Sequence, residues 1–447
     1  MCGTSNSMHP GRQGRDILTM DQLKDLLLDL LFAPADRPSA KDVSLTEDEA
    51  EIVLAWAQEH RVGPLLMHAV QARAGDGLFP ATLREPLRRM RTNAAFRTLA
   101  MQSMILNAHR ILDAAGIPHL FLKGAYLSLY CYPEAGLRPM RDLDILVPMD
   151  RALEAYEAMI GAGFTRHPEY PGVPSAFLEK GQHFPPLRAG GGRGTIEMHF
   201  RLADTRAVSA GRQANFQQLF DRAITRSFQG EALIFPGPED FLLHLCVHAA
   251  YQHNFDNGPL GVADIQWLLA SSAIDWPLFW KLAEDEGAVV GAALCLRLAE
   301  TLCGDIGVAW TTEAREAVDA SPDVVRHAAR SLLQDFHSRR DAKLRVALSS
   351  TTPLSGRFRE LQARIFPSRR HLARSYPFES GALMLWLCYP VHWKRLFSQR
   401  LPSMLRSRVS RTAKSDVESL CAISNFLSEP RTQPAGATLH TKAGGDR

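Results

Sequence analysis

The sequence predicts an α+β protein, in which a small mixed β-sheet is flanked by helical N-terminal and C-terminal regions. Two short runs, Asp142–Val147 and Thr195–Leu202, alternate between polar and apolar residues as half-buried strands do. Long stretches with helical spacing of apolar residues surround them, among them Asp21–Leu31 and Ala81–Ala115. Because the strands are confined to the middle of an otherwise helical chain, we expect this fold class.

The same patterns divide the chain into segments. Thr46 followed by three acids marks a helix start, and Gly116-Ile117-Pro118 marks the end of the long helix before the first strand. We expect a disordered leader at 1–16, a helical region at 17–115, the strand-containing core at 116–235, a second helical region at 236–330, a basic helical region at 331–427 and a disordered tail at 428–447.

Composition indicates a soluble globular protein of two or three domains. The net charge of +3 over 447 residues is too small to indicate a general nucleic-acid coat. The seven cysteines are scattered, odd in number and without CxxC spacing, which favours reduced thiols in a cytoplasmic protein over disulfides or a zinc site. The N-terminus has no apolar run typical of a signal peptide.

The run from 121 to 147 carries the strongest functional signal. A short apolar strand ends at Lys123-Gly124, and a helix and a turn lead to a second strand. Asp142 and Asp144 share one face of that strand, and the apolar residues around them share the other. Paired carboxylates of this kind can hold one or two Mg²⁺ ions together with substrate phosphates.

A third carboxylate lies on the strand at 195–202. Glu197, His199 and Arg201 form its polar face, and the residues between them form an apolar face. If this strand pairs beside the first, Glu197 joins the two aspartates over one patch of sheet. Three clustered carboxylates repel one another unless cations neutralise them, so a metal ion is their natural partner.

With these motifs the chain resembles the nucleotidyltransferase fold of the DNA polymerase beta superfamily, and more narrowly a large bacterial family of uncharacterised nucleotidyltransferases. The resemblance rests on Lys-Gly at 123–124, Gly-x-Arg at 136–138, Asp-x-Asp at 142–144 and Glu-x-His at 197–199. These motifs span roughly residues 115–202, and a looser helical similarity extends to about residue 305.

The resemblance implies a transferase that moves a nucleoside monophosphate from a triphosphate, most simply ATP, to a hydroxyl or phosphate of a small-molecule or protein acceptor. By position, Asp142, Asp144 and Glu197 would be the catalytic residues and the ligands of two Mg²⁺ ions. The helical region at 236–330 would hold the acceptor. No template nucleic acid is implied, because nothing in the chain resembles a duplex-binding domain.

The nucleotide-binding residues implied by the resemblance are Lys123, Gly124 and Arg138. Gly124 would let the chain approach the phosphates closely, and Arg138 would neutralise their charge; its alternative is an ion pair with the neighbouring aspartates. Most members of the superfamily have Gly-Ser where this chain has Lys123-Gly124. The phosphate-binding hydroxyl is therefore missing, and Lys123 would substitute as a point charge.

Three further residues are weaker substrate-binding candidates: His199, His248 and Asp264. For His248 and Asp264 the alternative is a satisfied buried polar pair, and for His199 a structural role on its strand. His244 and His248 share one helix face at the spacing of zinc ligands, but no third ligand accompanies them, so packing or substrate contact is the favoured interpretation.

The last third of the chain is basic, with 17 Lys and Arg against three acids between Arg339 and Lys414. Within it Gly381–Trp393 is strongly apolar, but its 13 residues are too few to span a bilayer. We favour a core helix with a solvated basic end, and the alternative is peripheral contact of residues 381–414 with a membrane surface.

Two rival functions remain open at this level. One is a catalytically inactive binding module with the nucleotidyltransferase fold, which the missing serine supports and the intact acids oppose. The other is an adaptor that binds a membrane surface or nucleic acid through the basic segment.

Overall fold

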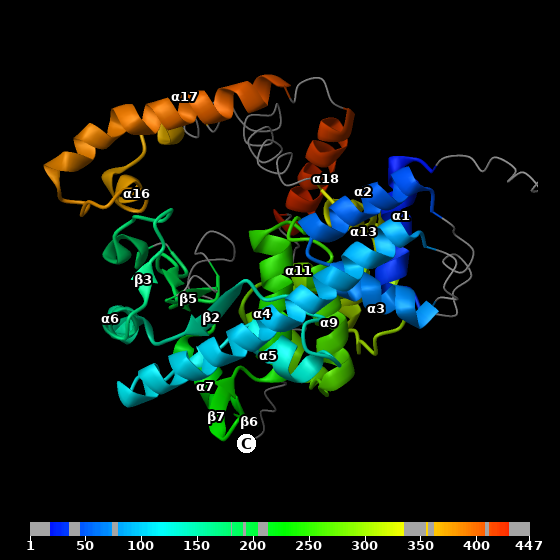
Figure 1. Cartoon of the computed structure of the whole chain (residues 1–447), viewed down its shortest axis with the longest axis horizontal. Coiled ribbons are helices and arrows are strands. Elements are labelled where there is room, and N and C mark those ends of the chain that lie inside the picture. The colour runs from blue at the N-terminus through cyan, green and yellow to red at the C-terminus, as the bar shows by residue number, and fades with distance from the viewer. Residues whose placement is uncertain are drawn as a thin grey trace, which may run out of the picture.

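The computed structural model describes residues 18–34, 45–73, 79–179, 181–190, 194–203, 213–334, 355, 362–406 and 411–428 of the chain. In these residues helices surround a five-stranded mixed sheet, which confirms the predicted α+β class (Figure 1). The expected disordered segments at 1–16 and after residue 428 lie outside the described residues.

The sheet brings the two predicted strands together as direct neighbours. Its strands are β1 (Leu120–Phe121), β2 (Asp142–Leu146), β3 (Thr165–Arg166), β4 (Leu187–Arg188) and β5 (Thr195–His199). They lie in the order β1-β2-β5-β4-β3, and only β2 and β5 are parallel to each other. In their register Asp144 lies opposite Glu197, so the pairing on which the sequence argument was conditional is present.

One face of this sheet is the centre of the core. Leu143, Ile145, Ile196 and Met198 are all fully buried on it, as the period of the two strands predicts. The helices α4 (Ala81–Ala114) and α6 (Ala152–Gly161) pack against these strands. The opposite face of β2 and β5 carries the polar residues. Because the apolar face is buried, the polar face must point away from the core.

Four helices precede the sheet and form the N-terminal region. They are α1 (Met20–Phe32), α2 (Glu47–Glu59), α3 (Gly63–Arg73) and α4. The helices α1 and α2 each begin with a capping box, from Thr19 and Thr46, in which side chains satisfy backbone N–H groups of the first turn. Residues 60–62, between α2 and α3, connect this region to the polar side of the sheet.

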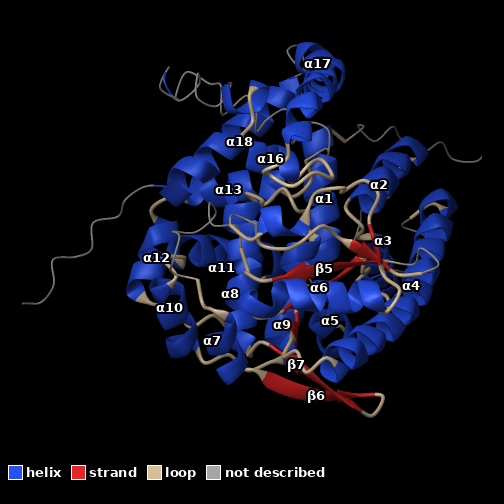
Figure 2. Cartoon of the chain, turned by 90° about the vertical axis from the view of Figure 1, so that its left-hand side faces the viewer, coloured by secondary structure: helices blue, strands red, loops and turns tan. Residues whose placement is uncertain are grey.

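Short elements connect the strands of the core. They are α5 (Gly124–Tyr126), the π-helix η2 (Leu127–Cys131), the 3₁₀-helices η3 (Met149–Arg151) and η4 (Pro174–Phe177), and α7 (Phe216–Asp221). A separate hairpin of β6 (Ile224–Phe228) and β7 (Glu231–Phe235) packs beside β1 (Figure 2).

A second set of helices follows the hairpin. They are α8 (Pro238–Val247), the π-helix η5 (His248–Gln252), α9 (Leu260–Ser271), α10 (Trp276–Asp285), α11 (Val289–Cys303), α12 (Thr312–Asp319) and α13 (Pro322–Ser331). The helix α11 contributes an almost continuous buried surface against α8 and α9. The loop between η5 and α9 faces the polar side of the sheet.

The C-terminal elements attach to the molecule at two places. They are α16 (Arg369–Ala373), the 3₁₀-helix η6 (Leu383–Leu387), α17 (Cys388–Arg406) and α18 (Arg411–Ser428). Near the sheet, the backbone N–H of Val173 donates to the carbonyl of Ala373 at 2.9 Å. At the other end α18 packs against α13, so that α17 runs between the sheet side and the helical side (Figure 1). We call residues 362–406 the C-terminal arm.

The favoured interpretation of Gly381–Trp393 as a core helix is wrong. Within this stretch only Leu385 and Cys388 are buried, and most of its large apolar side chains are exposed. The stretch is a 3₁₀ turn followed by the start of α17, where Pro390 is tolerated because it lies in the first helical turn. No helix among the described residues combines the length and the apolar character that crossing a bilayer requires.

Candidate active site

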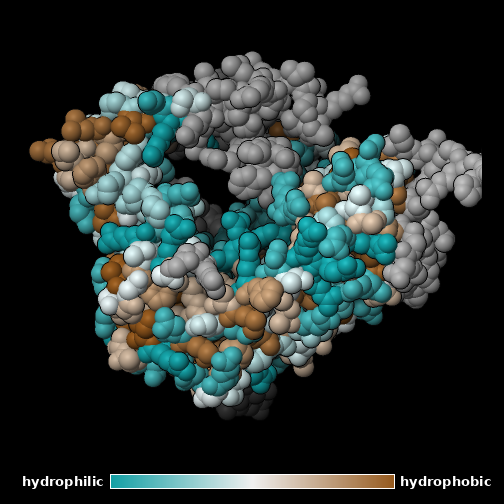
Figure 3. Space-filling model, in the orientation of Figure 1, coloured by the Kyte–Doolittle hydropathy of each residue, from teal (hydrophilic) through white to brown (hydrophobic). Residues whose placement is uncertain are grey.

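A cavity of about 610 Å³ lies over the polar face of β2 and β5. Three parts of the chain line it: residues 59–61 after α2, the ends of β1, β2 and β5 with their loops, and residues 245–264 of the second helical region. Its lining is mostly charged or polar. Hydrophilic residues also surround the hollow between the C-terminal arm and the rest of the molecule in the space-filling view (Figure 3).

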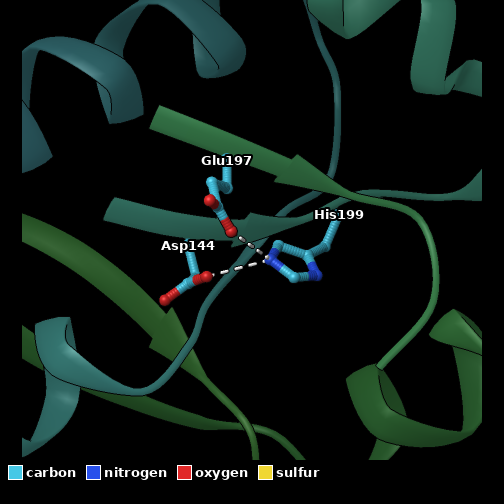
Figure 4. Close-up of side chains that lie close together, drawn as sticks. All are labelled: Asp144, Glu197 and His199. Atoms are coloured by element: carbon cyan, nitrogen blue, oxygen red, sulfur yellow. Dashed lines mark hydrogen bonds and ion pairs between the residues drawn. The ribbon is translucent and has the colours of Figure 1, made fainter. Parts of the chain in front are cut away.

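The floor of the cavity holds a compact group of one histidine and two carboxylates. The Nε2 atom of His199 lies 2.9 Å from Oδ1 of Asp144 and 3.6 Å from Oε2 of Glu197 (Figure 4). One ligand atom from each of the three lies within 4.8 Å of the others, which is close enough for a shared metal ion. Among the described residues no other group of three or more such side chains meets this criterion.

Asp142 stands one step along the same face. It pairs in register with Thr195 rather than with Glu197, so its carboxylate lies beside this group and not within it. It lines the cavity and has no hydrogen bond or ion pair with any described residue. The structure thus brings all three predicted acids to one face and joins two of them most closely.

Lys123 supplies a positive charge at the same place. Its Nζ atom donates a hydrogen bond of 3.0 Å to Oδ1 of Asp144, and both side chains are largely buried. Its backbone has φ = 41°, which is uncommon for a residue with a side chain. Burial alone would lower the pKa of Lys123, but Asp144, Glu197 and Asp142 raise it, so the ammonium stays charged.

The pKa values of the acids diverge because each has a different neighbour. Burial, followed by the charges of Asp144 and Glu197, raises the pKa of Asp142. Burial would also raise the pKa of Asp144, but Lys123 and His199 hold it well below its usual range. Burial would raise the pKa of Glu197 as well, but the hydrogen bond from His199 outweighs it and lowers that pKa. The folded protein therefore offers ionised carboxylates at Asp144 and Glu197.

Gly124 and Arg138 meet each other in the cavity wall. A Cβ atom on residue 124 would lie 2.5 Å from Nη1 of Arg138, so the absence of a side chain there lets the guanidinium approach the backbone. The other nitrogens of Arg138, Nε and Nη2, donate to the two carboxylate oxygens of Asp264 at 2.7 and 2.8 Å. The hydroxyl of Tyr132 also donates to Asp264, at 2.8 Å. The partner of Arg138 is thus Asp264 and not the aspartates on β2.

His248 and Asp264 both line the cavity but do not pair with each other. His248 Nδ1 lies 2.7 Å from the amide oxygen of Gln252, and its ring is 4.4 Å from that of His253. Burial, followed by the charge of Lys123, lowers the pKa of His248 well below its usual range. His248 is therefore neutral; its Nδ1–H donates to Gln252, which leaves Nε2 able to accept one hydrogen bond from a bound molecule.

His244 does not form a zinc site with His248. It is buried, neither of its ring nitrogens has a hydrogen-bond partner among the described residues, and burial lowers its pKa to about 3. No third ligand joins the two histidines in the part of the chain that the structure describes. His244 is a packing residue, whereas His248 lines the cavity.

Several cavity residues were not predicted from the sequence. Arg61, His183, His253 and Asp256 all line the cavity. His183 lies 3.8 Å from Glu197 through Nε2, and His253 pairs with Asp256 at 3.2 Å. The only sequence signal for Arg61 is its place at a helix end just before Gly63-Pro64, which by itself indicates a turn and not a site.

Uncommon backbone conformations gather around the cavity. Five described residues other than glycine have positive φ, and four of them, Arg61, Lys123, Asn254 and Phe255, belong to segments that line it. Such conformations cost free energy and persist where the surrounding structure enforces them, which is frequent at functional sites.

Comparison with known proteins identifies one family. Its description is "uncharacterised nucleotidyltransferase", and it matches residues 46–304, which is more than half of the chain and includes all the cavity segments. No curated protein and no solved structure matches the chain significantly.

Proposed function

The chain belongs to the family of uncharacterised nucleotidyltransferases, and from this premise we propose that it is an active enzyme of the DNA polymerase beta-like type. It would transfer a nucleoside monophosphate from a triphosphate, ATP in the first instance, to a hydroxyl or phosphate of its acceptor. The observation that carries the proposal is the pairing of Asp144 opposite Glu197, with Asp142 on the same face, beneath a polar cavity.

The acids fit a magnesium-dependent reaction. Asp142, Asp144 and Glu197 offer carboxylate oxygens, which Mg²⁺ prefers, and we assign two ions to them. We assign His199 to the positioning of Asp144 and Glu197, because its nitrogen is a poorer ligand for Mg²⁺ and it is already bonded to Asp144. When bound, the ions would neutralise phosphate charge and lower the pKa of the acceptor hydroxyl.

The cations around the cavity would bind the triphosphate. Lys123 lies at the acids, and Nη1 of Arg138 has no hydrogen-bond partner among the described residues. Arg61 lines the cavity together with Asp142 and makes no ion pair within the described residues, so its guanidinium is available to a ligand. Glu197 is ionised and could take the proton of the attacking hydroxyl.

We assign the acceptor to the side of the cavity made by the second helical region. His248, His253 and Asp256 lie there, and Asp264 orients Arg138 from the same region. Few apolar side chains line this side, so the acceptor should present hydroxyl or phosphate groups. Free thiols at the described cysteines are in keeping with a cytoplasmic enzyme.

One observation favours the inactive binding module instead. The ion pair between Lys123 and Asp144 already supplies a cation to the carboxylate that a metal ion would need. If this pair persists when a nucleotide is bound, the site could bind the nucleotide without turnover.

Calorimetric titration with each of the four triphosphates and Mg²⁺ tests the proposal. We expect one nucleotide to bind the wild-type protein, and Asp142→Asn/Asp144→Asn to weaken binding by about a hundredfold because the metal ligands lose their charge. The control Asp48→Asn/Asp150→Asn removes two exposed acids and should leave binding unchanged.

The outcomes separate the candidate functions. If no triphosphate binds the wild-type protein, the assignment of the donor site is wrong. If one binds but no pyrophosphate is released with water or a small-molecule extract as acceptor, the binding module is favoured. If the double variant binds as tightly as the wild type, the acids do not hold the metal.

A further inference from the structure

The C-terminal arm carries an apolar surface that none of the described residues covers. Its largest contributions are Leu383, Leu387 and Trp386, whose side chains are 81%, 65% and 57% exposed. We call these three residues, together with the exposed Met384 and Val391, the apolar tip. In the space-filling view hydrophobic residues gather at the end of the arm where α16 and the start of α17 lie (Figure 3).

The backbone beneath the apolar tip is held in place by its own packing. Leu385 and Cys388 are buried with Leu372 and Tyr376 in a small separate core. Two hydrogen bonds join the start of α17 to the segment before α16. Trp393 Nε1 donates to the carbonyl of Ile365, and the hydroxyl of Tyr389 donates to the carbonyl of Pro367, both at 2.7 Å. The fold therefore holds the side chains of the apolar tip in their exposed positions.

Cations follow the apolar tip along the helix. Along α17, exposed Arg395 lies four residues after exposed Val391, so the two share one side of the helix. Exposed Lys394 directly precedes Arg395, and Trp386 and Leu387 end the 3₁₀-helix η6 just before α17. An apolar surface bordered by cations is the arrangement of proteins that bind at the surface of a bilayer.

The charge of the whole arm favours an anionic partner. Residues 362–406 contain eight Lys and Arg against one acid, Glu379, which already accepts a hydrogen bond from Ser175 at 3.2 Å. A second copy of the chain would bring an equally basic arm against this one, and like charges would oppose the contact. An anionic lipid surface satisfies both the apolar and the cationic parts of the arm.

We propose that the apolar tip inserts into the interface of an anionic lipid bilayer, with Lys394 and Arg395 at the lipid phosphates. The protein then binds the membrane peripherally, because α17 is neither long enough in its apolar part nor free enough of charge to cross it. This binding does not depend on the proposed nucleotide site, which lies on other elements.

Sedimentation with lipid vesicles tests the proposal on the full chain. We expect the wild-type protein to bind vesicles that contain phosphatidylglycerol and not vesicles of phosphatidylcholine alone, and to bind more weakly at high salt. Leu383→Glu/Leu387→Glu should weaken binding about tenfold or more, and Lys394→Glu/Arg395→Glu should do so at low salt.

The matched control is Phe96→Glu/Leu99→Glu on α4. These two side chains are 68% and 58% exposed, so the control places the same charges on another exposed apolar pair, and we expect it to bind like the wild type. Trp386→Phe should remove the blue shift of tryptophan fluorescence that vesicles induce in the wild type.

Three results would overturn the proposal. The first is a wild-type protein that does not bind anionic vesicles. The second is an equal loss of binding in the α4 control. The third is a wild-type dimer in solution that Leu383→Glu/Leu387→Glu dissociates, since the apolar tip would then be covered by a second copy. Retention of vesicle binding by Asp142→Asn/Asp144→Asn would show that the two sites are independent.

Discussion

At Lys123 a backbone conformation and an ion pair depend on each other. A residue with positive φ costs on the order of 1–3 kcal/mol when it is not glycine, and Lys123 has φ = 41°. The ion pair with Asp144 compensates for this, because without it a carboxylate would be buried beside Glu197 with only His199 as a counter-charge.

We predict that Lys123→Met destabilises the protein and that Mg²⁺ reverses part of the loss. Removal of one member of a buried ion pair should lower the free energy of unfolding by about 3 kcal/mol. A metal ion bound to the carboxylates that have lost Lys123 as their partner should restore part of this free energy. Denaturant unfolding with Mg²⁺ and with a chelator measures both quantities. Lys281→Met, which breaks an exposed pair with Asp285, is the control and should change little.

If Lys123→Met lost the same free energy of unfolding with and without Mg²⁺, the prediction would be wrong. The same result would also indicate that Lys123 and not a metal ion is the resident cation of the site, which favours the binding module.

At the residue scale the sequence was informative where local periodicity decides direction. The spacing of Asp142 and Asp144 was enough to place both on one face of their strand, because side chains alternate along any strand, whereas Glu197 joins them only through the pairing of β2 with β5. The sequence could not predict that Arg138 pairs with Asp264, since those residues are 126 positions apart and meet only through the packing of α9. The alternative interpretation of Arg138, an ion pair with the neighbouring aspartates, is therefore wrong, because its partner is Asp264.

At the scale of single elements, the end of α10 contains an unusual buried acid. Glu286 follows the helix directly, is 8% exposed, and accepts a hydrogen bond from the backbone N–H of Ala214 at 3.1 Å. Burial raises its pKa from an ordinary value of 4.5 to about 7. The folded chain therefore keeps its proton in a range of pH where the unfolded chain has released it.

We predict that Glu286 lowers the free energy of unfolding by an amount that depends on pH. Between about pH 4.5 and 7 the unfolded state binds fewer protons than the folded state, so stability falls as the pH rises, by about 3 kcal/mol in total, and is level above that range. Glu286→Gln is neutral at every pH, so its free energy of unfolding should rise relative to the wild type across this window. Denaturant unfolding at about pH 5, 6, 7 and 8 measures the difference between the two proteins. If the free energies of unfolding of the wild type and Glu286→Gln changed with pH in parallel, this prediction would be wrong.

Element boundaries were predictable where capping and turn residues stand in the sequence. Thr46 with Glu49, and Gly116 before Ile117, coincide with a helix start and a helix stop in the structure. The stretch at 381–393 was misjudged because apolar composition alone does not say whether a partner surface exists. This stretch packs Leu385 and Cys388 into a small core and leaves most of its large apolar side chains exposed.

At the scale of the whole molecule, the cavity exists only because three distant parts of the chain meet. Arg61 from the N-terminal helices, β2 with β5, and the loop after η5 each contribute one wall. Burial lowers the pKa of Arg61, and the charge of Asp142 is the largest opposing influence; both residues line the cavity. The N-terminal region is thus a part of the proposed nucleotide site.

We predict that Arg61→Gln weakens binding of the nucleotide about tenfold without unfolding the protein, because one charged contact to phosphate is lost. Calorimetry with the nucleotide that binds the wild type measures the effect, and Arg61→Lys should retain part of the affinity. The control is Arg88→Gln, which removes an exposed guanidinium paired with Glu85 on α4. Unchanged affinity in Arg61→Gln would exclude Arg61 from the site while leaving the acids untested by this result.

The register of the sheet also sets an order of events during folding. The antiparallel neighbour of β2 is β1, a short distance earlier in the chain, whereas its parallel neighbour β5 follows after about fifty residues. Closing the shorter loop costs less entropy, so the pairing of β1 with β2 is favoured to form first. That pairing brings Lys123 to Asp144, and Glu197 arrives only when β5 docks. On this order the ammonium of Lys123 lies beside Asp144 before the carboxylate of Glu197 approaches from β5, so the repulsion between these two acids is offset before it arises.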